Sequence, residues 1–204
     1  MSLSNIISND TNKVNLIGAR SREIVVFNVS PELSISRSIS YKAMEPVHLP
    51  GQIHAYEKTQ NRTFSLNAKI ISRTRIEASL NLNRFNVIQS WGMSHFGKQE
   101  NVRLYGPLGA PPEVLYLTAY ANANARQTLY RIPTVLTSIN YTYPNDVDYV
   151  EASDMNISTG DLFVNGTPWP AIMNIELSLL EVHSPKDFSN FSLRKYKQGK
   201  LTNF

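Results

Sequence analysis

The clearest alternation of apolar and polar side chains in this chain lies between residues 131 and 150. A period of two residues is typical of a β-strand with one buried face. Leu136 and Thr137 interrupt the alternation, and residues 144–146, Pro-Asn-Asp, end the strand because proline lacks an N–H and Asn and Asp favour turns. The large apolar positions that define the strand are Val135, Ile139, Tyr141 and Tyr143.

The same period, or a short apolar run, predicts further strands on both sides of this one. An Asn165-Gly166 pair follows one of them and is typical of a hairpin turn. In the last strand, Met173, Ile175, Leu177 and Leu179 share one face. The predicted strands cover residues 23–29, 33–41, 63–71, 74–82, 102–105, 113–120, 162–164 and 171–181.

A change of period at residue 84 predicts one helix. Asn83 suits its N-cap and Gly97 the position after its last turn. Trp91 on its apolar stripe is expected in the core, and His95 is expected to be a hydrogen-bonded histidine at the core or its edge. The apolar stripe, at 100° per residue, contains Phe85, Val87, Ile88, Trp91 and His95.

About ten strands against one helix predict a mostly β fold, an antiparallel β-barrel or sandwich with one flanking α-helix. Residues 1–22 are polar and are expected to be flexible unless a partner holds them. The Pro- and Gly-containing stretch 44–51 marks a boundary after an N-terminal hairpin. We therefore divide the chain into an N-terminal extension with a β-hairpin, 1–62, and a β domain, 63–204, that ends in an arm from about residue 184.

Composition narrows the class of protein. The 204 residues include no cysteine, which excludes disulfides, thiolate metal sites and a cysteine nucleophile, and which favours a reducing interior. No secretory signal and no run of about 18 apolar residues is present, so we expect neither export nor a membrane span. The net charge of +4 is spread thinly along the chain, which is typical of a solvated or subunit-facing surface.

A search for catalytic and metal sites identifies no candidate catalytic, cofactor-binding or metal-binding residue, and the chain is expected not to be an enzyme. The four histidines, His48, His54, His95 and His183, lack the spacing of a zinc-binding helix. The loop 106–112 is rich in Gly and Pro but lacks the ending of a phosphate-binding loop. Four acidic residues, Asp146, Asp148, Glu151 and Asp154, either bind a hard cation or form a solvated loop, and we favour the loop.

The C-terminal tail mixes basic and aromatic residues. Such a tail either stacks on single-stranded nucleic acid or packs its rings on a neighbouring protein, and we favour a protein-binding arm. The basic residues are Arg194, Lys195, Lys197 and Lys200, and the aromatic ones include Phe188, Phe191 and Tyr196.

Five segments of the C-terminal two thirds, read together, resemble the tail-tube and tube-initiator proteins of contractile-tailed bacteriophage baseplates. The resemblance covers roughly residues 63–204. The segments are 109–117 (GAPPEVLYL), 132–139 (IPTVLTSI), 143–150 (YPNDVDYV), 169–175 (WPAIMNI) and 181–185 (EVHSP).

The resemblance implies a structural virion protein of the tail or baseplate, assembled in the host cytoplasm. It implies a homohexameric ring whose inner sheets join into a tube, next to further tail-tube, hub or baseplate proteins, with DNA as a non-specific passenger in the lumen. It supplies no catalytic residues and no cofactor. Under this interpretation Asp146 and Asp148 form a ring-to-ring contact, and Phe188, Phe191 and Tyr196 of the arm contact an adjacent subunit.

Two other classes remain open. A β-sandwich binding module at the tail tip would bind carbohydrate or a receptor through exposed Trp169, Tyr116 or Tyr149. A hydrolase would need a cluster of titratable residues, which the sequence does not display.

Overall fold

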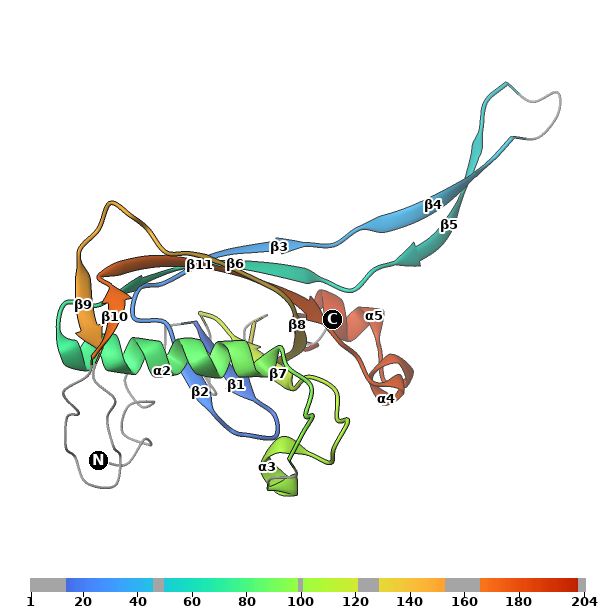
Figure 1. Cartoon of the computed structure of the whole chain (residues 1–204). Coiled ribbons are helices and arrows are strands. Elements are labelled where there is room, and N and C mark those ends of the chain that lie inside the picture. Colours follow the sequence, from blue (N-terminus) through green and yellow to red (C-terminus); the bar gives the residue numbers. More distant parts are fainter. Residues whose placement is uncertain (1–13, 46–49, 99–100, 121–128, 153–165, 202–204) are drawn as a thin grey trace.

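The computed structural model describes residues 14–45, 50–98, 101–120, 129–152 and 166–201 (Figure 1). The predicted fold class is confirmed: the chain is mostly β, with one large antiparallel sheet and one long helix, α2, lying along a face of that sheet. The described strands form open sheets and no closed barrel.

The main sheet has seven strands in the order β2-β1-β7-β8-β11-β6-β3, and every neighbouring pair is antiparallel. Strands from both sides of residue 62 share this sheet, and the division into two domains there stays a prediction. The strands are β1 (Asn15–Gly18), β2 (Ile24–Val26), β3 (Glu32–Ser36), β6 (Thr63–Ile71), β7 (Val114–Thr118), β8 (Ile132–Thr142) and β11 (Ile172–Glu181).

Side chains alternate between the two faces of this sheet along each strand, and the inner face is apolar. The predicted apolar face of the last strand is confirmed, since Met173, Ile175, Leu177 and Leu179 are fully buried. Across the sheet, one row of the inner face pairs Ile139 with Leu177 and Leu177 with Leu66. These side chains form the core together with the buried face of α2.

Strand β8 contains a β-bulge where the sequence breaks its alternation. Ser138 lies opposite Ser178, but Leu136 lies opposite Leu179, so Thr137 is the extra residue. The bulge brings Leu136 and Ile139 onto the same, inner face, whereas the alternation in the sequence predicts one shared face for Val135 and Ile139. That grouping was wrong because one extra residue reverses the facing of all residues that follow it.

Helix α2 runs over Arg75–Trp91, so the strand predicted at 74–82 was wrong. Thr74 is the N-cap and its hydroxyl accepts a hydrogen bond from the Glu77 N–H. The Glu77 carboxylate in turn accepts from the Arg73 N–H at 2.8 Å. These contacts begin the helix earlier than the predicted Asn83, and it ends at Gly92 and not at Gly97.

The predicted core face of this helix is confirmed. Phe85, Ile88 and Trp91 are all buried. His95, just beyond the helix, is hydrogen bonded as expected, through Nδ1 to the Gly106 carbonyl at 2.9 Å.

Two other local predictions differ from the structure, and a further group cannot be compared with it. Residues 102–105 form a short helix, α3 (Val102–Tyr105), because the Asn101 side chain caps it by accepting from the Arg103 N–H. Within the segment expected to be flexible, Val14 and Leu16 are fully buried, since β1 lies between β2 and β7 in the sheet. The predicted connection at 121–128, the strand at 162–164 and residues 1–13 lie outside the described residues.

Two hairpins and a helical tail complete the structure. Strands β4 (Ile39–Met44) and β5 (Ile53–Thr59) pair with each other and project from the body of the molecule (Figure 1). Met44 lies opposite Ile53, so the stretch 44–51 connects two paired strands. The sequence predicts a boundary after a hairpin at this stretch, and the pairing places the stretch inside a hairpin instead. The remaining elements are β9 (Tyr149–Ala152), β10 (Thr167–Pro170), α4 (Pro185–Ser189) and α5 (Leu193–Lys197).

Candidate assembly surfaces

Three exposed tyrosines form a platform next to the end of β8. Tyr141 lies on β8, Tyr143 follows it and Tyr149 begins β9. The Tyr141 and Tyr143 rings meet edge to face at 5.8 Å between centroids. Burial, followed by the proximity of Tyr141 and Tyr149, raises the pKa of Tyr143 above its ordinary value. The Tyr149 hydroxyl donates to the Pro144 carbonyl at 2.8 Å, which holds the loop that follows β8.

Two buried aromatic rings support this tyrosine platform from below. Phe85 of α2 contacts Tyr141 edge to face at 4.8 Å, and Trp169 of β10 lies 6.4 Å from Tyr143. Phe85 and Trp169 also contact each other, at 5.4 Å. The platform is therefore held by the core, although its outer surface faces solvent.

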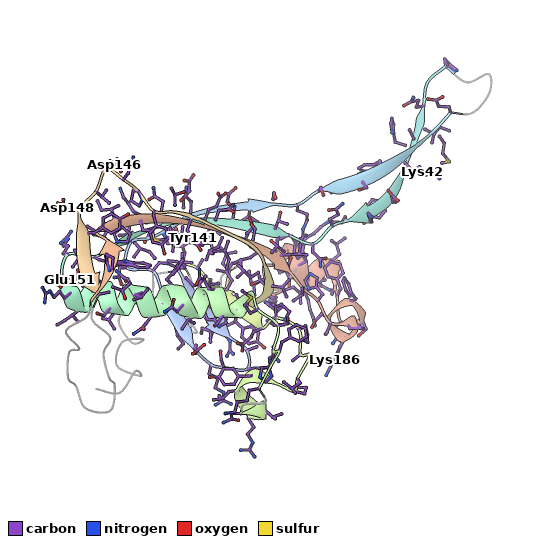
Figure 2. The ribbon with its side chains drawn as sticks, in the orientation of Figure 1. Lys42, Tyr141, Asp146, Asp148, Glu151 and Lys186 are labelled. Atoms are coloured by element: carbon purple, nitrogen blue, oxygen red, sulfur yellow. The ribbon has the colours of Figure 1, made fainter. Side chains whose placement is uncertain are left out.

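Acidic side chains lie in the segment that joins and follows the tyrosines of the platform. The predicted contact residues Asp146 and Asp148 are exposed in the loop between β8 and β9, and Glu151 follows them on β9. Figure 2 shows all three at the same end of the molecule. Glu151 forms an exposed ion pair with Arg75 at 3.1 Å. Asp154, the fourth member of the predicted acidic group, lies outside the described residues.

The C-terminal arm, residues 184–200, lies at the opposite end of the main sheet, where β11 ends and β8 begins. A capping box between Ser184 and Asp187 starts α4, because the Ser184 hydroxyl and the Asp187 carboxylate bond each other's backbone N–H. The hydrogen bonds of Ser184 lower the pKa of Asp187. The two short helices present the predicted contact residues Phe188, Phe191 and Tyr196 as exposed side chains.

The structure therefore places the predicted contact residues in two separate groups. Asp146 and Asp148 share the loop after β8, and Phe188, Phe191 and Tyr196 share the arm. Phe191 and Tyr196 lie 6.0 Å apart, and Phe188 stacks edge to face on His183 at 5.3 Å. Lys186 marks the arm in Figure 2, well away from Asp146 and Asp148. Whether these residues form assembly contacts stays a prediction.

A buried charge cluster anchors the arm and was not found from the sequence. Glu181, the last residue of β11, is fully buried and accepts from the Arg62 backbone N–H and, at 2.9 Å, from Arg62 Nε. Arg37 and His183 each approach its carboxylate to 3.6 Å. Burial acts to raise the pKa of Glu181, but the hydrogen bonds and charge of Arg62, with a smaller effect of His183, outweigh it and lower the pKa. Arg37 and Arg62 are more than a hundred residues from Glu181 in the sequence, and no motif marks the cluster.

The β4–β5 hairpin is a further surface that the sequence did not single out. Tyr41 and Tyr56 lie opposite each other on it, with ring centroids 6.0 Å apart, and both are more than half exposed. Ile39, Met44 and Ile53 on the same hairpin are also exposed. An exposed two-stranded ribbon with this many apolar side chains is typical of an element that binds a partner.

The outer face of the main sheet, opposite α2, carries small polar side chains over four neighbouring strands, β8, β11, β6 and β3. One row across these strands consists of Ser138, Ser178, Ser65 and Ser34. The next row consists of Asn140, Glu176, Asn67 and Glu32. The same face over β7, β1 and β2 carries apolar side chains, such as Tyr116, Ile17 and Ile24, and these are half-buried or exposed.

The stacking residues of the alternative binding module are not all available. Trp169 is buried beneath Tyr143, so it cannot stack on a sugar ring. Tyr116 lies under the Arg131 guanidinium, 5.0 Å from the ring centroid. Tyr149 alone of the three is well exposed.

Within the described ranges, no three His, Asp or Glu side chains are placed to share a metal ion. His48 lies outside these ranges. None of the helices in the described part of the chain is long and apolar enough to cross a membrane.

Comparison with known proteins finds similarities among solved structures. No protein-family model matches the chain, and no curated protein matches its sequence. Among solved structures, the chain is similar to one in the "Cryo-EM structure of the anti-feeding prophage (AFP) baseplate, 6-fold symmetrised", with 10% sequence identity and a TM-score of 0.35. The match covers 84% of this chain and 88% of that one. A TM-score of 0.35 is too low to indicate a shared fold or role.

Proposed function

We propose that this chain is a structural protein without catalytic activity that assembles into a ring in a contractile tail or baseplate, with the polar outer face of its main sheet lining an aqueous channel. The observation that carries the proposal is the chemistry of that face. A row of serines and a row of alternating asparagines and glutamates cross β8, β11, β6 and β3, and they offer hydrated side chains with no Lys or Arg among them. Such a surface lets a polyanion such as DNA slide without binding, because phosphate affinity comes from Lys and Arg.

Ring formation is supported by two exposed features of the main sheet, its edge strands and the apolar part of its outer face. Strands β2 and β3 are its edges, and an unpaired edge is stabilised by pairing with another chain. The apolar outer face over β7, β1 and β2 would lose its contact with water against a neighbouring copy. The resemblance to tube and tube-initiator proteins suggests six copies, and adjacent tail-tube, hub or baseplate proteins as further partners.

The first test is the state of assembly. We expect sixfold rings, or seeded tubes, when the purified chain is measured by native mass spectrometry and negative-stain microscopy, alone and mixed with a neighbouring tube protein. A chain that stays monomeric under all these conditions, or that binds glycans as a monomer or trimer, would contradict the proposal.

A second test concerns which face lines the channel. Because the chain has no cysteine, a single spin label is attached uniquely to Asn140→Cys, on the polar outer face, or to Asn83→Cys, on the exposed side of α2. We expect pulsed EPR on assembled rings to give a shorter distance between neighbouring copies at position 140 than at position 83, because the channel lies at the smaller radius. The reverse order would place α2 inside and overturn the assignment of the face.

A further inference from the structure

We propose that the C-terminal arm of one copy docks on the acidic tyrosine platform of the next copy, so that these two surfaces are the halves of one head-to-tail interface. This inference rests on the proposed function and names the partner of both surfaces. The arm is residues 184–200, and the platform is Tyr141, Tyr143 and Tyr149 with Asp146, Asp148 and Glu151 of the same segment.

The charges of the two surfaces are complementary. The arm carries five basic side chains, Lys186, Arg194, Lys195, Lys197 and Lys200, against one acidic side chain, Asp187. The segment from Tyr143 to residue 152 carries three acidic side chains and no Lys or Arg. Arg75 of α2 pairs with one of the three, Glu151, which leaves Asp146 and Asp148 as the charges offered to a partner. Opposite charges across an interface accelerate association and select the partner. Two arms, or two platforms, would repel each other.

The apolar parts are complementary as well. The arm exposes Phe188 and Phe191, which are 58% and 43% accessible, and the platform exposes three tyrosines that are 40–51% accessible. Aromatic pairs gain free energy beyond the burial of their area, and a Lys or Arg over a tyrosine face adds to it. Tyrosines supported by buried Phe85 and Trp169 lose little conformational entropy on binding, which is typical of the centre of an interface.

One copy cannot join its own two surfaces. The arm follows Glu181, which lies opposite Thr134 near the start of β8, whereas the platform begins at Tyr141 near the end of β8. The seven steps of β8 from Thr134 to Tyr141 span about 23 Å. Figures 1 and 2 show α4 and Lys186 at one end of the sheet and Asp146 and Asp148 at the other. The contact must therefore be made between copies.

A contact between two different surfaces of identical chains is heterologous, and it closes into a ring or continues as a filament. The same geometry gives the buried Glu181 cluster a role. Glu181, with Arg62 and Arg37, holds the base of the arm to the body. A partner bound to the arm is therefore attached to the main sheet through these residues.

The test uses charge reversal on the full chain. The platform variant is Asp146→Lys with Asp148→Lys, the arm variant is Lys195→Glu with Lys197→Glu, and a fourfold variant combines them. A control variant, Lys98→Glu with Arg103→Glu, changes exposed charges outside both surfaces. Sedimentation velocity over a range of concentrations measures association, and circular dichroism checks that each variant is folded.

We expect the platform variant and the arm variant each to associate roughly 100-fold more weakly than the natural chain, because the substituted positions then face side chains of the same sign and the arm variant loses its net positive charge. The fourfold variant should associate again, and so should an equimolar mixture of the two single-surface variants, in which each contact has opposite charges. High salt should weaken association of the natural chain.

The outcomes separate this interface from the proposed function. A natural chain that assembles while both single-surface variants assemble equally well overturns the interface and leaves the ring intact. A control variant that loses association as strongly as the others, or a mixture that is not restored, also overturns it. An arm variant that assembles normally but loses affinity for a single-stranded oligonucleotide would identify the arm as a nucleic-acid surface instead. A natural chain that never self-associates fails the proposed function itself.

Discussion

At the scale of single residues, Glu181 connects segments that lie in different parts of the sequence. Its buried carboxylate contacts Arg62 before β6, Arg37 after β3 and His183 before the arm. Because the guanidinium groups of Arg62 and Arg37 are held around one anion, removing the anion leaves two positive charges facing each other in a partly buried site.

The substitution Glu181→Gln should therefore lower the free energy of unfolding by roughly 3–5 kcal/mol, measured by urea denaturation. The matched control is Glu151→Gln, which removes the carboxylate of an exposed ion pair with Arg75 and should cost less than about 1 kcal/mol. Equal losses in the two variants would mean that the Glu181 cluster adds nothing beyond a surface contact.

The same carboxylate predicts a pH dependence. The pKa of Glu181 is lower in the folded chain than its ordinary value of 4.5, so the unfolded chain takes up the proton first as the pH falls. Its stabilisation is complete above the unfolded pKa and is lost as the pH falls through the folded pKa. The difference in unfolding free energy between the natural chain and Glu181→Gln should shrink below about pH 4.5. A difference that stays constant down to pH 3 would be inconsistent with a lowered pKa.

At the scale of elements, the start of α2 shows how a local cap decides between strand and helix. Residues 76, 78, 80 and 82 alternate as a strand would, yet Thr74 and Glu77 begin a helix there. The sequence Thr-x-x-Glu at residues 74–77 is a capping signature, and it predicts a helix start at this position. Thr74→Ala should lower the free energy of unfolding by about 1 kcal/mol, and Thr74→Ser should retain it because the hydroxyl is kept. If Ala and Ser behave alike in chemical denaturation, the cap does not stabilise the fold.

The β4–β5 hairpin is an element whose strands pair with each other and with no strand of the main sheet among the described residues. At its base the Gln60 N–H donates to the Ser38 carbonyl at 2.9 Å, so residues 39–59 can be replaced by an Asn-Gly turn. We expect the shortened chain to keep its thermal midpoint within about 5 °C, because the hairpin buries none of the core residues. A chain that no longer folds would show that the hairpin belongs to the folding unit.

At the scale of the whole molecule, the arm and the main sheet make separable contributions. The core consists of strand and α2 side chains, and neither α4 nor α5 contains a buried residue. Truncation after Pro185 should therefore leave a folded chain, with near-natural circular dichroism, that no longer assembles in sedimentation or electron microscopy. A truncated chain that still forms complete rings would exclude the arm from assembly.

Much of the fold follows from local patterns in the sequence. The apolar periods of β6, β8 and β11 predict strands because every second side chain must leave water, and the predicted β11 core face is fully buried. The break at Leu136 and Thr137 marks the bulge that the structure contains. Short elements such as α3 were missed, because four residues do not distinguish one period from another.

The sequence by itself determined a mostly β chain with a buried helical stripe, a Cys-free core and the two groups of candidate contact residues. Only the tertiary structure decided that the Glu181 carboxylate lies beside Arg62 and Arg37, since these contacts join residues more than a hundred positions apart. It also decided that Trp169 supports the tyrosine platform from inside and that the arm and Asp146 lie at opposite ends of β8. Long-range pairing sets these positions, and alternation along one strand carries no information about which strand lies beside it.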